Sequence, residues 1–206
     1  MPIRASLLQE VLRDSYKKNK DIESPAGYTL DRSLSTNQAK VFKSDNSNDV
    51  IVAHRGSATK NDWMDNYSYA RYGNVKKTDT YKAAKRVQNQ AIRKYGADNI
   101  TSVGHSRSGL YVQELNDRPE TKVKSAITYN KAAGPSDIFR KNPENQTDIR
   151  TDKDVVSLLS PFQKHKKDTV TIHHDGFNPI SAHTPDDLSK LGDELVGTGI
   201  PFYALF

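Results

Sequence analysis

A strand-like run passes directly into a helix-like run within residues 99–115, NITSVGHSRSGLYVQEL. Strand character ends at Val103, and Leu110, Tyr111 and Leu115 then follow at the spacing of one helix face. Only a tight turn fits between the two runs. A strand that leads into a helix through so short a turn is typical of an α/β sheet, and it limits the chain to that class of fold.

Further strand and helix patterns alternate along the chain. Residues 38–44 and 49–56 are strand-like runs joined by the turn-rich DNSN, which predicts a hairpin. In residues 78–96, TDTYKAAKRVQNQAIRKYG, the spacing of apolar residues predicts a helix, and Gly96 is expected to end it. Together they predict an α/β sheet that is parallel in its centre and has a hairpin near its N-terminal side. The other expected elements are helices at about 60–73 and 107–117, strands at 123–130, 148–151 and 168–174, and a final helix beginning TPDDLSKL.

The length of 206 residues, 34% of them apolar, suits one core, so we expect a single domain over residues 1–206. Residues 1–25 are expected to be an N-terminal helical extension, since Leu8, Val11 and Leu12 recur at helical spacing among charged residues. This segment is too polar for a signal peptide, and no run approaches transmembrane length. We therefore expect a soluble protein, with an intracellular or virion-associated location favoured.

The charge and the cysteine count restrict the partners. A net charge of +6 suggests affinity for anionic surfaces, but the basic residues are scattered, which favours a solvated basic surface. A basic nucleic-acid-binding module is one alternative, although no binding motif or basic-aromatic stripe is present, so no nucleic acid is expected. The absence of cysteine excludes disulfides and thiolate metal sites.

Ser106 lies in the tight turn between the strand-like and helix-like runs, where it is either a helix cap or a nucleophile. A nucleophile elbow is crowded, so the positions two before and two after the serine must be small, and Gly104 and Ser108 meet that demand. The helix that follows presents N–H groups and a positive dipole end, which favour a developing oxyanion.

Other stretches bear on this choice. VIVAHRGSATKNDWMDN joins a strand, a small-residue turn and an acidic, aromatic helix start, and ITSVGHSRSG contains the serine turn. They resemble the FRGT…DW block and the GHSLGG elbow of the class 3 (fungal-type) lipases. AITYNKAAGPSD loosely resembles the GxPRVGN segment of that family, and IRTDKDVVSLLSP resembles its VV…DPVPRLPP block. NPISAHTPDDL lies where the family keeps its last triad member, so the resemblance covers roughly residues 35–190.

The resemblance implies an α/β-hydrolase-like fold, with a mostly parallel central sheet and helices on both faces. It implies a Ser–Asp–His triad of Ser106, Asp154 and His183, with Asp152 as the fallback acid, in the chain order of that fold. It also implies an oxyanion hole. In the mechanism we expect, the backbone N–H of Arg107 and the N–H or hydroxyl of Ser57 hold the oxyanion during cleavage of a carboxylic ester.

Local chemistry independently supports His183 as the base. Thr184, Pro185 and Asp187 predict a helix start directly after it, which would leave the histidine in a fixed loop. His105 is expected to pack in the elbow. The adjacent His173 and His174 suggest a metal, but neighbours on a strand point to opposite faces and no third ligand follows, so neither metal nor cofactor is expected.

The departures from the family concern the substrate. Arg107 and Ser108 replace a common leucine and glycine, and residues 60–76, where the family often has an apolar lid, are amphipathic and carry Trp63 and Met64. We therefore expect an ester or phospholipid substrate and peripheral contact with an anionic membrane. The apolar C-terminal IPFYALF is expected to be a last strand or plug.

One more alternative keeps the fold without the chemistry. Compact basic chains of this kind also resemble lipase-like proteins of large DNA viruses and virophages, which implies a virion component. A catalytically silent, structural hydrolase fold is therefore the first rival to the esterase reading.

Overall fold

The computed structural model describes residues 2–57, 75–132, 141–154, 156 and 169–197. The expected helix at 60–73, with Trp63 and Met64, and the C-terminal IPFYALF lie outside these residues.

A seven-stranded sheet organises the described part of the chain, with its strands in the order of the sequence. The first three strands are antiparallel neighbours, which confirms the predicted hairpin, and the remaining neighbours are parallel. The predicted α/β fold with a parallel centre is confirmed. The strands are β2 (Tyr28–Leu30), β3 (Ala39–Ser44), β4 (Val50–His54), β5 (Ile100–His105), β6 (Ser125–Tyr129), β7 (Gln146–Thr151) and β8 (Thr169–Ile172).

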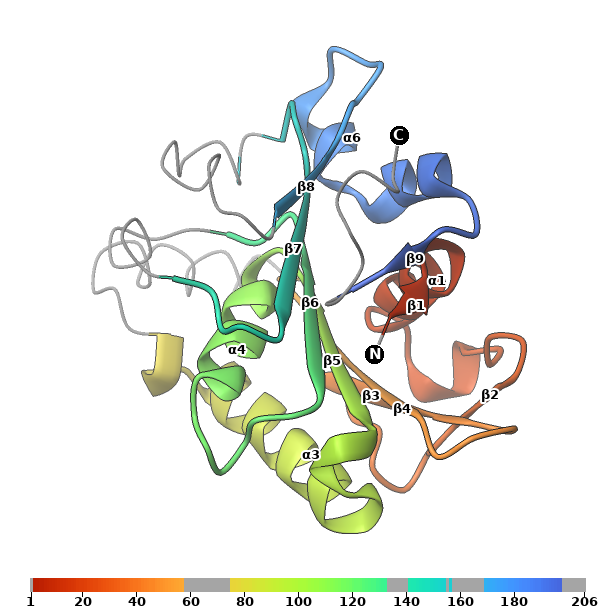
Figure 1. Cartoon of the computed structure of the whole chain (residues 1–206), viewed down its shortest axis with the longest axis vertical. Helices are drawn as coiled ribbons and strands as arrows, with labels where there is room; N and C mark the ends of the chain where they lie inside the picture. Colours follow the sequence, from red (N-terminus) through yellow and green to blue (C-terminus); the bar gives the residue numbers. More distant parts are fainter. Residues whose placement is uncertain (1, 58–74, 133–140, 155, 157–168, 198–206) are drawn as a thin grey trace.

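Helices cover both faces of this sheet (Figure 1). The α3 helix (Asp79–Tyr95) and α4 (Arg107–Asn116) lie on one face, and α1 (Ala5–Asp14) lies on the other. Neighbouring residues of β4 show the same division, because Ile51 belongs to the core under α1 whereas Val52 belongs to the core under α3. The sheet is therefore buried on both sides, as parallel strands require.

Local signals account for both ends of α3, and the helix ends at Gly96 as predicted. The Thr78 side chain accepts a hydrogen bond from the backbone N–H of Tyr81 and caps the amino end. Gly96 has a φ of 82° and ends the helix, since a side chain there would be strained.

The N-terminal segment is tied to the C-terminal part of the described chain. A two-residue strand β1 (Ile3–Arg4) pairs antiparallel with β9 (Leu195–Val196), and α1 packs against a 3-10 helix, η6 (Pro185–Leu191). Sequence analysis missed β1 and β9, because strands of two residues carry no measurable period. No helix in the described ranges is long and apolar enough to cross a membrane.

Candidate active site

Ser106 has an unusual backbone conformation at the carboxyl end of β5. Its φ is 58° and its ψ is −127°, a region that residues other than glycine seldom adopt. It directly precedes α4, and its backbone N–H donates to the Tyr129 carbonyl at 3.0 Å. Such strain persists only where the surroundings enforce it, and it is the conformation expected of a nucleophile elbow.

The elbow is crowded on both sides of Ser106. A Cβ atom at Gly104 would lie 2.6 Å from the Ser108 carbonyl oxygen and 2.8 Å from a Val112 methyl. The Ser108 hydroxyl is used within the turn, where it accepts from the His105 N–H at 2.9 Å and lies 2.7 Å from the His54 carbonyl oxygen. The close approach of α4 to β5 explains why small residues occupy both positions.

His183 lies between Ser106 and Asp154. Its Nε2 is 2.8 Å from the Ser106 hydroxyl oxygen, and its Nδ1 is 2.9 Å from a carboxylate oxygen of Asp154. The Asp154 side chain is fully buried, whereas that of His183 is 23% exposed. The imidazole can therefore meet a solvent-borne substrate while its rear nitrogen is held by a desolvated carboxylate.

The fallback acid occupies a different place. Asp152 accepts hydrogen bonds from the backbone N–H of His174 at 3.0 Å and pairs with the His173 ring at 2.6 Å. Asp154 lies two residues further along, and its carboxylate also accepts from the Val156 N–H at 3.1 Å. Of the two carboxylates, Asp154 is the one that contacts His183.

A short helix carries His183, rather than the loop that the sequence predicted. The α6 helix (Pro179–His183) begins at Asn178, whose side chain accepts from the Ile180 N–H, with Pro179 at the first helical position. The Asn-Pro pair was the missed signal for a helix start. The expected helix after Thr184 is the 3-10 helix η6, and the Thr184 side chain does not cap it.

The predicted oxyanion residues lie beside the elbow. Arg107 is the first residue of α4, so its backbone N–H lies at the amino end of the helix, where the helix dipole is positive. Ser57 follows Gly56, at which an added Cβ would lie 3.4 Å from the Ser106 Cβ. The segment after β4 therefore passes against the serine, and Ser57 is the next residue in it.

The remaining described histidines have partners of their own. His54 is buried against Gln88, at 2.9 Å, and burial lowers its pKa to about 4. His174 contacts Asp187 at 2.6 Å and the Ser181 hydroxyl at 3.0 Å, a second Ser–His–Asp chain that sequence analysis did not find. Within the part of the chain that the structure describes, no three metal-ligating side chains gather, and His165 lies outside it.

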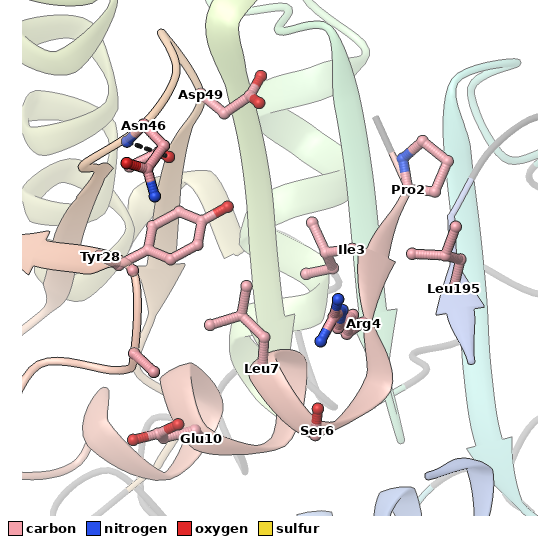
Figure 2. Close-up of a pocket in the computed structure, with 13 residues that line it drawn as sticks. Pro2, Ile3, Arg4, Ser6, Leu7, Glu10, Tyr28, Asn46, Asp49 and Leu195 are labelled. Carbon is pink, nitrogen blue, oxygen red and sulfur yellow. Dashed lines mark hydrogen bonds between the residues drawn. The ribbon is translucent and has the colours of Figure 1, made fainter. Parts of the chain in front are cut away.

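A separate cavity of about 530 Å³ lies away from these residues (Figure 2). It is lined by residues of β1 and α1, and by Tyr28, Ser44 and Asp49, which lie at the start of β2 and around the β3–β4 turn. Asp49 precedes β4, whereas Ser106 follows β5, which runs parallel to β4. The cavity and the elbow therefore lie at opposite ends of the sheet, and the cavity lining includes none of the predicted site residues.

No family model matches the sequence, and no curated protein has a matching sequence. Among solved structures, the chain is similar to the Lip2 lipase from Yarrowia lipolytica at a TM-score of 0.52 and 12% identity, over 85% of this chain and 82% of that chain. It is also similar to a triacylglycerol lipase from Penicillium expansum, at a TM-score of 0.45 and 15% identity over 96% and 85% of the two chains.

A predicted CIB-like hydrolase from Thermoplasma acidophilum has a TM-score of 0.45 and 20% identity, over 80% and 96% of the two chains. The likeness to the Yarrowia lipase and the strand order show an α/β-hydrolase-like fold. At such low identity the fold says nothing of the reaction, which must be argued from the side chains.

Proposed function

We propose that this protein is a serine hydrolase that cleaves carboxylic esters through an acyl-enzyme, with Ser106 as nucleophile, His183 as base and Asp154 as acid. The observation that carries the proposal is the continuous hydrogen-bond chain from the Ser106 hydroxyl through His183 to Asp154. Ser106, the first member of this hydrogen-bond chain, is also the residue whose backbone has the strained conformation of a nucleophile elbow. We also propose that residues 1–206 form one catalytic domain.

The geometry supports an ordered set of proton transfers. Ser106 Oγ attacks the ester carbonyl carbon while His183 Nε2 takes the hydroxyl proton. The π electrons of the carbonyl move onto the carbonyl oxygen, which becomes the oxyanion. The buried Asp154 carboxylate holds Nδ1–H and stabilises the imidazolium that results. The tetrahedral intermediate then collapses and expels the alcohol, which receives the proton from His183.

The second half of the reaction repeats the first with water. His183 removes a proton from a water molecule while the water oxygen attacks the acyl-enzyme carbonyl. The tetrahedral intermediate then collapses, the bond from its carbon to Ser106 Oγ breaks, and His183 returns the proton to Oγ as the carboxylic acid leaves. In both halves, we propose that the Arg107 N–H, together with the N–H or hydroxyl of Ser57, stabilises the oxyanion. The position of Arg107 at the amino end of a ten-residue helix supports this role, because the helix dipole also favours negative charge there.

Exposed apolar side chains on α6 and in the segment before it support a lipid ester as the substrate class. Phe177 is 98% exposed and Ile180 is 76% exposed, and Ile180 lies on α6, one helical turn before His183. The segment that carries Phe177 projects from the body of the molecule between β8 and α6 (Figure 1). The Lys153 amine lies 5.3 Å from the centre of the Phe177 ring, so the apolar surface has a cation beside it. Such a surface suits contact with an anionic lipid layer.

Labelling with a fluorophosphonate probe, mapped by mass spectrometry, tests the nucleophile without knowledge of the substrate. We expect the label on Ser106 in the wild type and its absence in Ser106→Ala. Hydrolysis of a short p-nitrophenyl ester by the two proteins then tests the reaction itself. An unlabelled Ser106, with equal hydrolysis by wild type and variant, would refute the enzyme and favour the silent hydrolase scaffold.

A double substitution tests the substrate class separately. Phe177→Ser with Ile180→Ser should leave hydrolysis of a dissolved ester unchanged and reduce hydrolysis of an ester presented in vesicles that contain anionic phospholipid. Leu195→Ser is the matched control, since Leu195 is the remaining large hydrophobic side chain that is exposed in the described residues, and it lies on β9 in the lining of the distant cavity. Equal losses in the control and the double variant would contradict a docking role for Phe177 and Ile180.

A further inference from the structure

His105, the residue before Ser106, joins the N-terminal segment to the backbone of His183. The Tyr16 hydroxyl oxygen lies 2.7 Å from His105 Nδ1, and His105 Nε2 lies 2.7 Å from the His183 carbonyl oxygen. The rings of His105 and His183 also stack at a tilt, with centroids 4.8 Å apart. The chain Tyr16–His105–His183 thus runs from just beyond α1 to the base proposed for catalysis.

The partners of His105 determine which of its nitrogens carries the proton. A carbonyl oxygen accepts hydrogen bonds and cannot donate them, so Nε2 must be protonated to bond with the His183 carbonyl. In a neutral ring Nδ1 is then an acceptor, and Tyr16 must donate its hydroxyl proton to it. Removing the Tyr16 hydroxyl would also allow the other tautomer, whose Nε2 lone pair would face the carbonyl oxygen.

The surroundings keep the His105 ring neutral. The residue is only 6% exposed, and burial, followed by the nearby His183, lowers the pKa of His105 to about 3. A neutral imidazole whose Nε2–H is bonded to a carbonyl and whose Nδ1 accepts from a hydroxyl is not arranged to act as an acid or a base at ordinary pH. Its contribution is therefore to hold its neighbours in place.

Resting on the proposed function, we propose that Tyr16 and His105 are positioning residues that hold the His183 main chain, so that its imidazole stays within reach of Ser106. Asn130 holds the same turn as well, because its amide donates to the Ala182 carbonyl at 2.9 Å and to that of His183 at 3.3 Å. The carbonyl of the base residue is therefore fixed by two side chains from neighbouring strand ends. This is how a base on a five-residue helix acquires a fixed position.

The position of Gly56 shows how closely Tyr16 is fitted into the elbow. A Cβ atom at Gly56 would lie 2.5 Å from the Tyr16 hydroxyl and 2.7 Å from the His105 carbonyl oxygen. A side chain at position 56 would therefore collide with the Tyr16 hydroxyl, and glycine leaves room for it. The N-terminal segment takes part in forming the site.

Variants of His105 and Tyr16 test the inference by turnover of a dissolved ester. We expect His105→Leu to lower kcat by about 10²-fold and Tyr16→Phe by about tenfold, both with KM little changed, because the geometry of the base is lost while substrate binding is kept. His105→Gln should recover most of kcat, since its amide nitrogen can occupy the place of Nε2 and donate to the His183 carbonyl. Tyr95→Phe is the control, because it also removes one hydroxyl hydrogen bond, that of Tyr95 to Asp31, away from the site.

Nitrogen NMR of histidine-labelled protein gives a readout that does not depend on activity. We expect His105 to be protonated on Nε2 in the wild type, and the His183 ring signals to move in His105→Leu but to stay in His105→Gln. A proton on Nδ1 of His105, unchanged His183 signals in His105→Leu, or a folded His105→Leu with wild-type kcat would each overturn the inference. A wild type that turns over no ester, while these signals behave as expected, would refute only the proposed function.

Discussion

Two Ser–His–Asp chains occur among the residues that the structure describes, and they have nearly the same internal geometry. In one, His183 lies 2.8 Å from Ser106 and 2.9 Å from Asp154; in the other, His174 lies 3.0 Å from Ser181 and 2.6 Å from Asp187. Both carboxylates are buried. Distances along such a chain therefore do not identify an active site by themselves, and the backbone of the serine has to be considered with them.

The surroundings of the two serines separate the chains. Ser106 has a strained backbone at the carboxyl end of a central strand and precedes a ten-residue helix. Ser181 lies within the five-residue α6, and its hydroxyl is 2.7 Å from the Asn178 carbonyl oxygen of the preceding turn. A serine that bonds back to its own helix is held away from a substrate. This difference supports the chemistry proposed for the first chain and suggests that the second chain anchors α6.

The largest expected difference between the chains lies at their serines. Ser106→Ala should reduce ester turnover by about 10³-fold or more and abolish fluorophosphonate labelling, because the acyl-enzyme cannot form. Ser181→Ala should keep both the label and near wild-type turnover. Label on Ser181 in the Ser106→Ala protein would break the comparison and make the second chain a reactive site.

The acids give the next largest effect. Asp154→Asn should lower kcat by about 10³- to 10⁴-fold without unfolding the protein, because an amide that donates to Nδ1 leaves the proton on Nε2, where His183 must accept one from Ser106. The matched control is Asp187→Asn, which changes the equivalent carboxylate of the second chain. Turnover lost only in Asp187→Asn would reverse the assignment of the two chains.

The second chain should matter more for stability than for chemistry. His174→Ala removes the ring that joins β8 to η6 and α6, and leaves Asp187 with fewer partners in a buried place. We expect a loss of about 1–3 kcal/mol in the free energy of unfolding. Because α6 carries His183, kcat should also fall, by about tenfold at most.

Urea unfolding and turnover of the same samples check this expectation. His173→Ala is the control, since the neighbouring His173 side chain is 68% exposed and should change stability by less than about 0.5 kcal/mol. A His174→Ala protein as stable as the control would show that the second chain anchors nothing.

The sequence predicted the candidate site residues better than it predicted the elements and side chains that hold them in place. The turn at Ser106 was recognisable because strand and helix patterns meet there with small residues on both sides, and Asp154 and His183 followed from the resemblance in chain order. The α6 helix was missed because five residues are too few to show a period, although Asn178 and Pro179 mark its start. The role of Tyr16 could not be predicted, since its contact with His105 joins residues 89 positions apart through the fold.

The smallest expected effect concerns Asp152, the carboxylate that lies near both chains and belongs to neither. Burial alone raises the pKa of Asp152. The hydrogen bonds from the backbone N–H of His174 and from the ring of His173 lower it by more than burial raises it, so the pKa is below its ordinary value. A carboxyl whose pKa is lowered by folding stabilises the protein fully above its unfolded pKa, and this contribution is lost as the pH falls through the folded pKa.

Asp152→Asn should therefore leave kcat unchanged and cost less than about 1 kcal/mol near neutral pH, since the side chain is 35% exposed and solvent screens its pairs. The difference in unfolding free energy between wild type and variant should stay constant down to about pH 5 and shrink as the pH falls below about 4, the ordinary pKa of aspartate, because the Asp152 carboxyl then becomes protonated and is uncharged like the amide. Chemical unfolding across that range measures the difference. A large loss of kcat in this variant, with Asp154→Asn active, would instead make Asp152 the acid and move the catalytic chain toward His173.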